Sequence, residues 1–143
     1  MVRHMEKIRL RISGEQTDEA GNVDRNETAA EGILFREGNR FRVEYTERPS
    51  EGTDTVRSRL LLSEGGMEMV REGALRSHMT FQPGHSCRTE YGTPFGSMFM
   101  EIETEFYRLL ERKKSIHARA RYRLRMDAGY SISCAVTVRI DLI

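Results

Sequence analysis

Two segments near the C-terminal end of the chain alternate between apolar and polar residues at every second position. The first carries Ile116, Ala118, Ala120, Tyr122, Leu124 and Met126 on one phase, and the second carries Ile132, Cys134, Val136, Val138, Ile140 and Leu142. A period of two places one kind of side chain on each face of a β-strand. Asp127-Ala128-Gly129 lies between the segments and its glycine readily adopts positive φ, so the pair is predicted to form a hairpin.

Similar alternating runs, separated by turn-forming residues, fill most of the remaining chain. We expect strands over 6–14, 30–37, 40–48, 53–63, 66–72, 74–82, 85–92, 95–108, 114–127 and 130–142. Residues 15–29 are polar without alternation and are expected to form a loop or a short helix. Residues 106–112 have some helical propensity, but they lie between two long alternating runs, and tertiary context is expected to override that preference.

About ten sequential strands predict an all-β chain that forms one domain over residues 1–143. The short connections favour antiparallel neighbours, because parallel pairs need a crossover of roughly a dozen residues. A sheet of this size usually curls or closes, since closure removes exposed edges. The last strand is apolar on one face, and the first strand, with Ile8, Leu10 and Ile12 in phase, is its natural partner. The expected fold is a closed antiparallel barrel, with a β-sandwich as the alternative.

Composition narrows the classes of function. Lys and Arg number 23 against 22 Asp and Glu, which leaves a net charge of +1 and argues against a general polyanion binder. The two cysteines, Cys87 and Cys134, lie far apart without a CxxC spacing, which favours the reducing cytoplasm. The N-terminal residues lack the apolar core of a signal peptide, and no run approaches the roughly 20 apolar residues of a membrane-spanning helix. We therefore expect a cytoplasmic protein that is not associated with a membrane.

Catalytic and metal-binding motifs are not recognisable in the sequence. His85 and Cys87 lie two positions apart, but no second pair accompanies them, as a zinc site would require. The segment 92–96 has too few glycines for a phosphate-binding loop, and no Gly-x-Ser-x-Gly elbow is present. The sequence therefore favours a protein that is not an enzyme, and we expect neither a metal nor another cofactor.

Several short segments follow one another in a distinctive order. They are Tyr45-Thr46-Glu47, Thr55, Val70-Arg71-Glu72-Gly73, Met79-Thr80-Phe81, Tyr91-Gly92-Thr93-Pro94-Phe95-Gly96, Thr104 and Tyr122-Arg123-Leu124. In this order and spacing they resemble a family of small, mostly bacterial proteins of unknown function typified by YwiB, and the resemblance covers about residues 6–142. It implies a calycin-like, lipocalin-like barrel and no established activity. A shared barrel is poor evidence for any one function.

The first candidate site lies inside the predicted barrel. Glu47 is in phase with the apolar residues of its strand, and Arg71 is in phase with Met67 and Met69 of another. An apolar cavity with a few convergent polar groups is typical of a small-ligand site. The predicted ligand-binding residues are Tyr45, Glu47, Arg71, Met79, Phe81, Tyr91, Thr104 and Tyr122. Buried charges are costly unless they are paired, so the alternative places Glu47 and Arg71 at the barrel rim, where one of them reaches water.

The second candidate site is a basic stripe on the outer face of the strand 114–127. It consists of His117, Arg119, Arg121, Arg123 and Arg125. The preceding strand carries Glu101, Glu103 and Glu105. A hairpin turn near Glu111 would place Glu105 opposite His117, Glu103 opposite Arg119 and Glu101 opposite Arg121, and cross-strand pairs of this kind would neutralise most of the stripe. Only Arg123 and Arg125 would then remain free for an anion.

Two functions from different classes follow from these sites. The first is a non-enzymatic barrel that holds a small apolar or amphipathic molecule in its lumen. The alternative is a protein or RNA interaction module that uses the stripe from His117 to Arg125 or the rim loops. A hollow lumen would favour the first function, and a filled lumen would favour the second.

Overall fold

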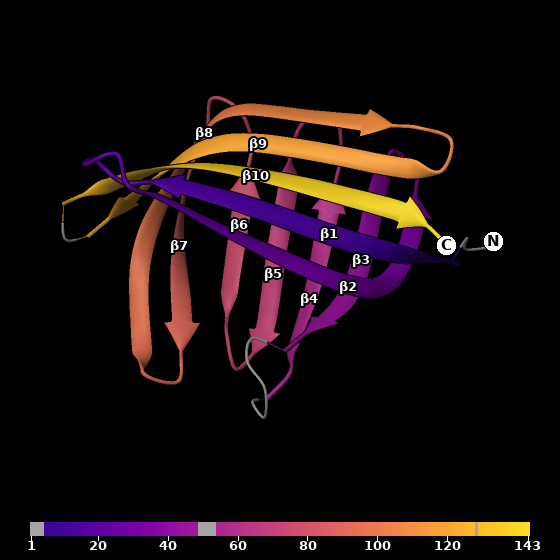
Figure 1. Cartoon of the computed structure of the whole chain (residues 1–143), viewed down its shortest axis with the longest axis horizontal. Coiled ribbons are helices and arrows are strands. Elements are labelled where there is room, and N and C mark those ends of the chain that lie inside the picture. Colours follow the sequence, from indigo (N-terminus) through magenta and orange to yellow (C-terminus); the bar gives the residue numbers. More distant parts are fainter. Residues whose placement is uncertain (1–4, 49–53, 128) are drawn as a thin grey trace.

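The computed structural model describes residues 5–48, 54–127 and 129–143, and its regular elements within them are ten β-strands (Figure 1). In chain order they are β1 (Met5–Thr17), β2 (Val23–Glu37), β3 (Arg40–Glu47), β4 (Val56–Leu62), β5 (Met67–Gly73), β6 (Ser77–Phe81), β7 (Ser86–Thr93), β8 (Gly96–Glu111), β9 (Ser115–Met126) and β10 (Ser131–Leu142). Each predicted strand has a counterpart. The start predicted for the fourth strand, at position 53, and Ala128 of the predicted last turn lie outside the described residues.

The strands form a single sheet in the order β6-β5-β4-β3-β2-β1-β10-β9-β8-β7. Strands that follow each other in the chain are antiparallel neighbours, except that β6 and β7 lie at the two edges. The first strand pairs with the last, from Ile8 opposite Leu142 to Thr17 opposite Ser133. The predicted all-β meander, including the pairing of its first and last strands, is confirmed.

The sheet curls into a nearly closed barrel. Strands β1, β9 and β10 cross in front of β3 to β6 at a steep angle, and the long strands β2 and β8 bend from one layer into the other (Figure 1). The edge strands approach through a bridge in which the Arg76 amide donates to the Gly92 carbonyl at 2.9 Å and the Gly92 amide donates back at 2.8 Å. The Thr89 hydroxyl adds a hydrogen bond to the His78 carbonyl at 2.7 Å. These contacts make the barrel, and not the open sandwich, the correct prediction.

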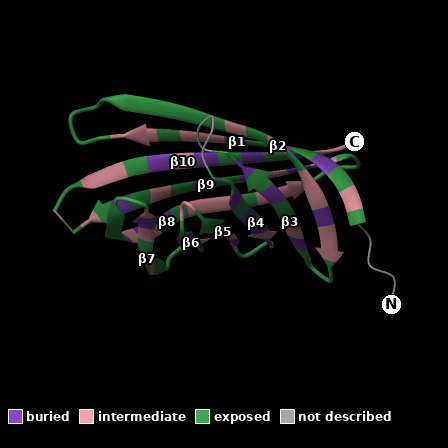
Figure 2. Cartoon of the chain, turned by 90° about the horizontal axis from the view of Figure 1, so that it is seen from below, coloured by how far each residue is buried: buried purple, intermediate pink, exposed green. Residues whose placement is uncertain are grey.

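The core lies between the two layers and is built from alternate residues of nearly every strand. Buried and exposed positions alternate along the ribbons in Figure 2. The largest side chains that are fully buried are Phe81, Ile8, Leu10, Leu34, Leu60, Leu62, Met67, Ile102, Ile116 and Ile140. Because one face of each strand is removed from water, the hydrophobic effect fixes which residues point inward, and a slip of one position would expose the whole set.

The polar segment 15–29 is neither a loop nor a helix, and this prediction is wrong. β1 continues to Thr17 and β2 begins at Val23, so the two strands extend as a long hairpin. Asp18 accepts hydrogen bonds from the backbone amides of Ala20 and Asn22 at 2.9 and 2.8 Å. Hydrogen bonds from Asn22 lower the pKa of Asp18. Neither face of the extension is buried, so nothing there selects for alternation.

The predicted register between β8 and β9 is also wrong. A β-bulge at Glu105 inserts an extra residue into β8, and the turn falls after Glu111, where the Arg112 amide donates to the Ser115 carbonyl at 2.8 Å. Glu103 therefore faces Arg123, and Glu101 faces Arg125. A bulge reverses the phase of the residues beyond it. The segment 106–112, which has some helical propensity, belongs to β8 as far as Glu111.

Candidate ligand site at the open end of the barrel

Two oppositely charged side chains meet on the inner face of the sheet. Glu47 ends β3, Arg71 lies near the end of β5, and Arg71 Nε is 3.3 Å from Glu47 Oε2. The side chain of Glu47 is 8% exposed and that of Arg71 is 25% exposed. Both residues keep the phase of the apolar side chains of their strands and point inward. The pair lies where the lumen meets water, which combines features of the lumen and rim alternatives.

Tyr45 and Ser58 lie beside this pair, at facing positions of β3 and β4. Burial raises the pKa of the Tyr45 hydroxyl, the Glu47 carboxylate raises it further, and the Arg71 guanidinium opposes both effects. Glu47 Oε1 and Ser58 Oγ are buried without a well-aligned hydrogen-bond partner among the described residues, although the Tyr45 hydroxyl lies close to both side chains. Since nearly all buried polar atoms in folded proteins are hydrogen-bonded, these two atoms mark a place where a partner is missing.

Tyr122 brings β9, from the opposite layer, to the same cluster. Its ring packs edge-on against Phe81 of β6, with ring centroids 4.7 Å apart and an interplanar angle of 62°. Burial raises the pKa of the Tyr122 hydroxyl, the neighbouring Cys134 raises it further, and the charge of Arg71 lowers it. Residues from β3, β4, β5, β6 and β9 therefore converge at one place.

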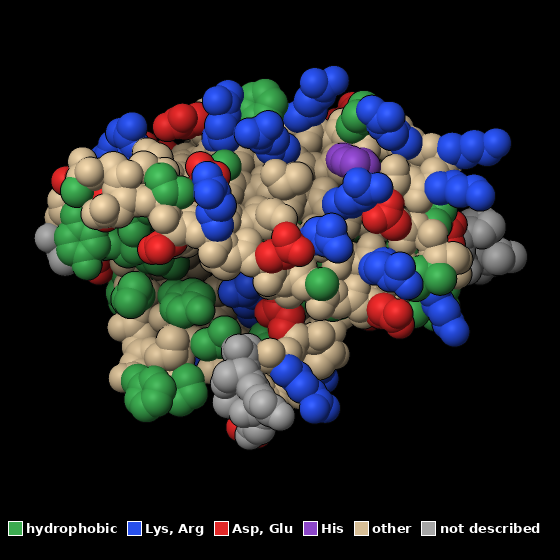
Figure 3. Space-filling view, viewed as in Figure 1, with side chains coloured by type: hydrophobic (Ala, Val, Ile, Leu, Met, Phe, Trp, Pro, Cys, Tyr) green, Lys and Arg blue, Asp and Glu red, His purple; other side chains and the backbone are tan. Residues whose placement is uncertain are grey.

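The lumen is open to solvent beside this cluster. Four side chains are only half-buried although they are in phase with buried residues of their strands: Met79, Tyr91, Tyr122 and Met126. Met98 shares the phase of the buried Met100 and is 52% exposed. Apolar side chains gather over the β7–β8 end of the molecule, at the lower left of Figure 3. The open end is defined here by Glu47, Arg71, Met79, Tyr91, Met98, Tyr122 and Met126.

The structure places every predicted ligand residue on the inner face. Tyr45, Glu47 and Arg71 form the polar cluster, Tyr122 connects it to the buried Phe81, and Met79 and Tyr91 line the opening. Thr104 is buried opposite Tyr122, and its hydroxyl lacks a partner among the described residues. The predicted set of ligand-binding residues did not include Ser58, Met98 or Met126. All three are in phase with apolar neighbours, so the alternation that identified Glu47 also contained a signal for them.

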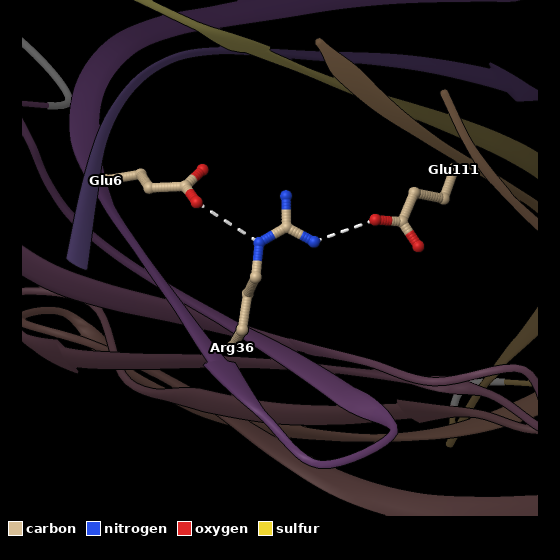
Figure 4. A network of polar contacts seen from close by, with 3 residues as sticks. All are labelled: Glu6, Arg36 and Glu111. Carbon is tan, nitrogen blue, oxygen red and sulfur yellow. Dashed lines mark hydrogen bonds and ion pairs between the residues drawn. The ribbon is translucent and has the colours of Figure 1, made fainter. Parts of the chain in front are cut away.

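A second inward-facing ion network lies at the opposite end of the lumen. Arg36 of β2 reaches between two carboxylates, with Nε 3.2 Å from Glu6 of β1 and Nη1 2.7 Å from Glu111 of β8 (Figure 4). Its guanidinium also lies 5.4 Å from the centre of the Phe41 ring, at the start of β3. The hydrogen bond to Glu111 is the main cause of a raised Arg36 pKa. The network joins β1, β2 and β8, and the end of the barrel where it lies is called the bridged end.

Comparison with known proteins agrees with this architecture. The family model described as "Domain of unknown function (DUF1934)" matches residues 10–138. The chain belongs to the DUF1934 family. Its structure is similar to the crystal structure of the ywiB protein from Bacillus subtilis, with a TM-score of 0.84 and 19% sequence identity over 97% of this chain and 93% of that chain. The likeness shows a shared fold, and the resemblance to the YwiB family is confirmed. No curated protein matches the sequence.

Three pockets open on the outer surface of this DUF1934 barrel. The largest, of about 630 Å³, lies over the outer face of β1 to β5 and includes Glu44, Arg57 and Arg59. A second, of about 450 Å³, lies over the seam between β6 and β7, and a third, of about 530 Å³, lies over β8 and β9. The middle of the lumen is filled by core side chains, which counts against a ligand held in the lumen itself. An interior ligand would have to lie at the open end, where Glu47 and Arg71 meet water.

Arg123 and Arg125, which were predicted to remain free for an anion, both lie close to a glutamate of β8. Arg125 Nη2 lies 3.3 Å from Glu103 Oε1, and Arg123 lies opposite the same glutamate. The prediction failed mainly because the turn was expected near Glu111 but lies between Arg112 and Ser115. The later turn shifts the acidic residues toward the β9–β10 turn and leaves Arg119 and Arg121 without a glutamate opposite them on β8, and the bulge at Glu105 changes the register by one position.

The described parts of this DUF1934 chain offer no metal-binding cluster. Within residues 5–48, 54–127 and 129–143, no three His, Cys, Asp or Glu side chains come close enough to hold an ion. The same residues include no helix that is long and apolar enough to cross a membrane.

Proposed function

We propose that this chain is a non-enzymatic binding protein that holds a small amphipathic molecule at the open end of its barrel. One observation carries the proposal: Glu47 Oε1 is buried without a partner, at the same end of the barrel as inward-facing methionines and tyrosines that solvent can reach. A carboxylate oxygen only accepts hydrogen bonds, so the missing partner is a donor. A ligand with an N–H or O–H group would supply it.

The surrounding residues define the rest of the ligand. The guanidinium of Arg71 has donors beyond the one that faces Glu47, so the polar head also carries an acceptor. Met79, Met98 and Met126 offer flexible apolar side chains that adapt to ligands of irregular shape. A primary amide on a short alkyl chain combines these properties. The unpaired cysteines, Cys87 and Cys134, support a further proposal that the protein acts in the reducing cytoplasm.

A thermal-shift series with octanamide, octylamine and octanoate tests the proposal. A molecule that binds only the folded state raises the unfolding midpoint as its concentration rises. We expect octanamide to stabilise the protein most and octanoate least, because a carboxylate head repels Glu47. The double variant Glu47→Leu/Arg71→Met removes the polar site and should lose the effect of octanamide.

The matched control is Glu44→Leu/Arg59→Met, which removes the same residue types from the outer faces of β3 and β4, where the two residues lie opposite each other. This control should respond to octanamide like the unmodified protein. If the control loses the response, the molecule binds in the large outer pocket. If no amphiphile shifts the midpoint and native mass spectrometry of protein from its own host retains no small molecule, the proposed function is wrong.

A further inference from the structure

The outer face of β8 and β9 keeps positive charge that the fold does not neutralise. The turn after Glu111 sets a register that places Arg108 directly opposite Arg119, and like charges in this position destabilise a sheet. The next strand offers no carboxylate, because Thr137 faces Arg119 and Ala135 faces Arg121. Among the described residues, Arg108, Arg112, Arg119 and Arg121 form no ion pair.

These arginines surround a pocket with an apolar floor. The pocket has a volume of about 530 Å³ and is lined by Phe106, Arg108, Leu110, Arg112, Arg119 and Arg121, among others. The Arg121 guanidinium lies 4.9 Å from the centre of the Phe106 ring. Lys and Arg side chains lie along the upper part of the molecule in Figure 3, where β8, β9 and β10 run in Figure 1. This pocket is called the basic groove.

We propose that the basic groove binds a short single-stranded nucleic acid. Arginine is suited to phosphate because its planar guanidinium donates two hydrogen bonds at once. Unpaired bases stack on aromatic rings and on guanidinium planes, and both surfaces are present in the stacked Arg121–Phe106 pair. An acidic peptide would pair with the arginines, but its carboxylates would not interact with the aromatic ring of Phe106. The net charge of +1 limits attraction elsewhere on the surface, so binding is local.

Fluorescence anisotropy with labelled oligouridylate and oligothymidylate of about twelve nucleotides tests the proposal. Binding should weaken as salt rises, with a log–log slope of about −0.7 for each phosphate contact in a single strand. The variant Arg108→Gln/Arg119→Gln should weaken binding at least about tenfold at low salt and reduce the slope by about 1.4. Phe106→Leu should weaken binding about tenfold and leave the slope unchanged, because stacking does not depend on salt in this way. Preference for the RNA over the DNA strand would indicate contacts to the 2′-hydroxyl.

The control variant, Arg57→Gln/Arg59→Gln, removes two exposed arginines from the outer face of β4 and should bind both oligonucleotides like the unmodified protein. A polyglutamate peptide should bind much more weakly than either oligonucleotide. Equal binding of the peptide would assign the groove to an acidic protein partner and overturn the proposal. An equal loss in the control variant, or no binding of either oligonucleotide at low salt, would also overturn it.

Discussion

At the scale of single residues, the two members of the Glu47–Arg71 pair are buried to different extents. Glu47 is nearly fully buried, whereas Arg71 reaches water. Arg71→Met should therefore lower the free energy of unfolding by about 1–3 kcal/mol, because it leaves a buried carboxylate unpaired. Adding Glu47→Leu should recover most of this loss. Urea denaturation of both variants measures the effect, with Arg57→Met as an exposed control. A change below about 0.5 kcal/mol in Arg71→Met would mean that the pair does not form.

Another residue-scale prediction concerns Cys134, whose thiol faces the core beside Tyr122. Burial raises the pKa of this thiol from 9.0 to about 11. A raised pKa means that the folded state holds the proton more tightly, so this stability is present below pH 9 and is lost as the pH rises toward 11. Between pH 8 and pH 10, the protein should lose about 1 kcal/mol more stability than its Cys134→Ala variant. Parallel pH profiles for the two proteins would contradict the prediction, and Cys87→Ala, at a more exposed thiol, serves as the control.

At the scale of elements, alternation predicted the strands that bury one face and failed where burial is absent. The hairpin of β9 and β10 follows directly from its apolar phase, whereas the extension of β1 and β2 beyond residue 14 buries neither face and leaves no such pattern. The register between β8 and β9 depends on the turn after Glu111 and on the bulge at Glu105, and the polar pattern marks the position of neither. The same parity located Glu47 and Arg71. The parity did not reveal the bridged end, because Glu111 lies on the other side of the bulge, where the inward-facing residues of β8 follow the opposite phase.

β3 approaches β2 so closely at Gly32 that only glycine fits there. A Cβ atom on Gly32 would lie 2.5 Å from the Glu44 carbonyl oxygen and 3.1 Å from Tyr45 Cβ. Gly32→Ala should therefore destabilise the protein by about 1–3 kcal/mol, as overpacking usually does. Gly65→Ala, where a Cβ would meet nothing within 4 Å, should change stability by less than about 0.5 kcal/mol. Equal effects of the two substitutions in urea denaturation would show that β3 can move away from β2.

At the scale of the whole molecule, the two ends of the barrel are chemically different. The bridged end joins β1, β2 and β8 through Arg36, which has a carboxylate on each side. The open end has one guanidinium, one buried carboxylate with an unpartnered oxygen, and methionines that solvent reaches. Since β3 runs from Phe41 at the bridged end to Glu47 at the open end, the filled core separates the two. Recognition in the lumen is therefore expected at one end only.

Methionine-methyl NMR during a titration with octanamide tests the central claim most directly. The methyl signals of Met79, Met98 and Met126 should shift and saturate together, while those of the buried Met67 and the distant, exposed Met5 stay in place. Arg36→Leu, a change at the bridged end, should leave the titration intact. Glu47→Leu/Arg71→Met should weaken it at least about tenfold, as expected for the loss of hydrogen bonds to charged groups. Shifts that include Met5, or that persist unchanged in this double variant, would contradict a ligand site at the open end.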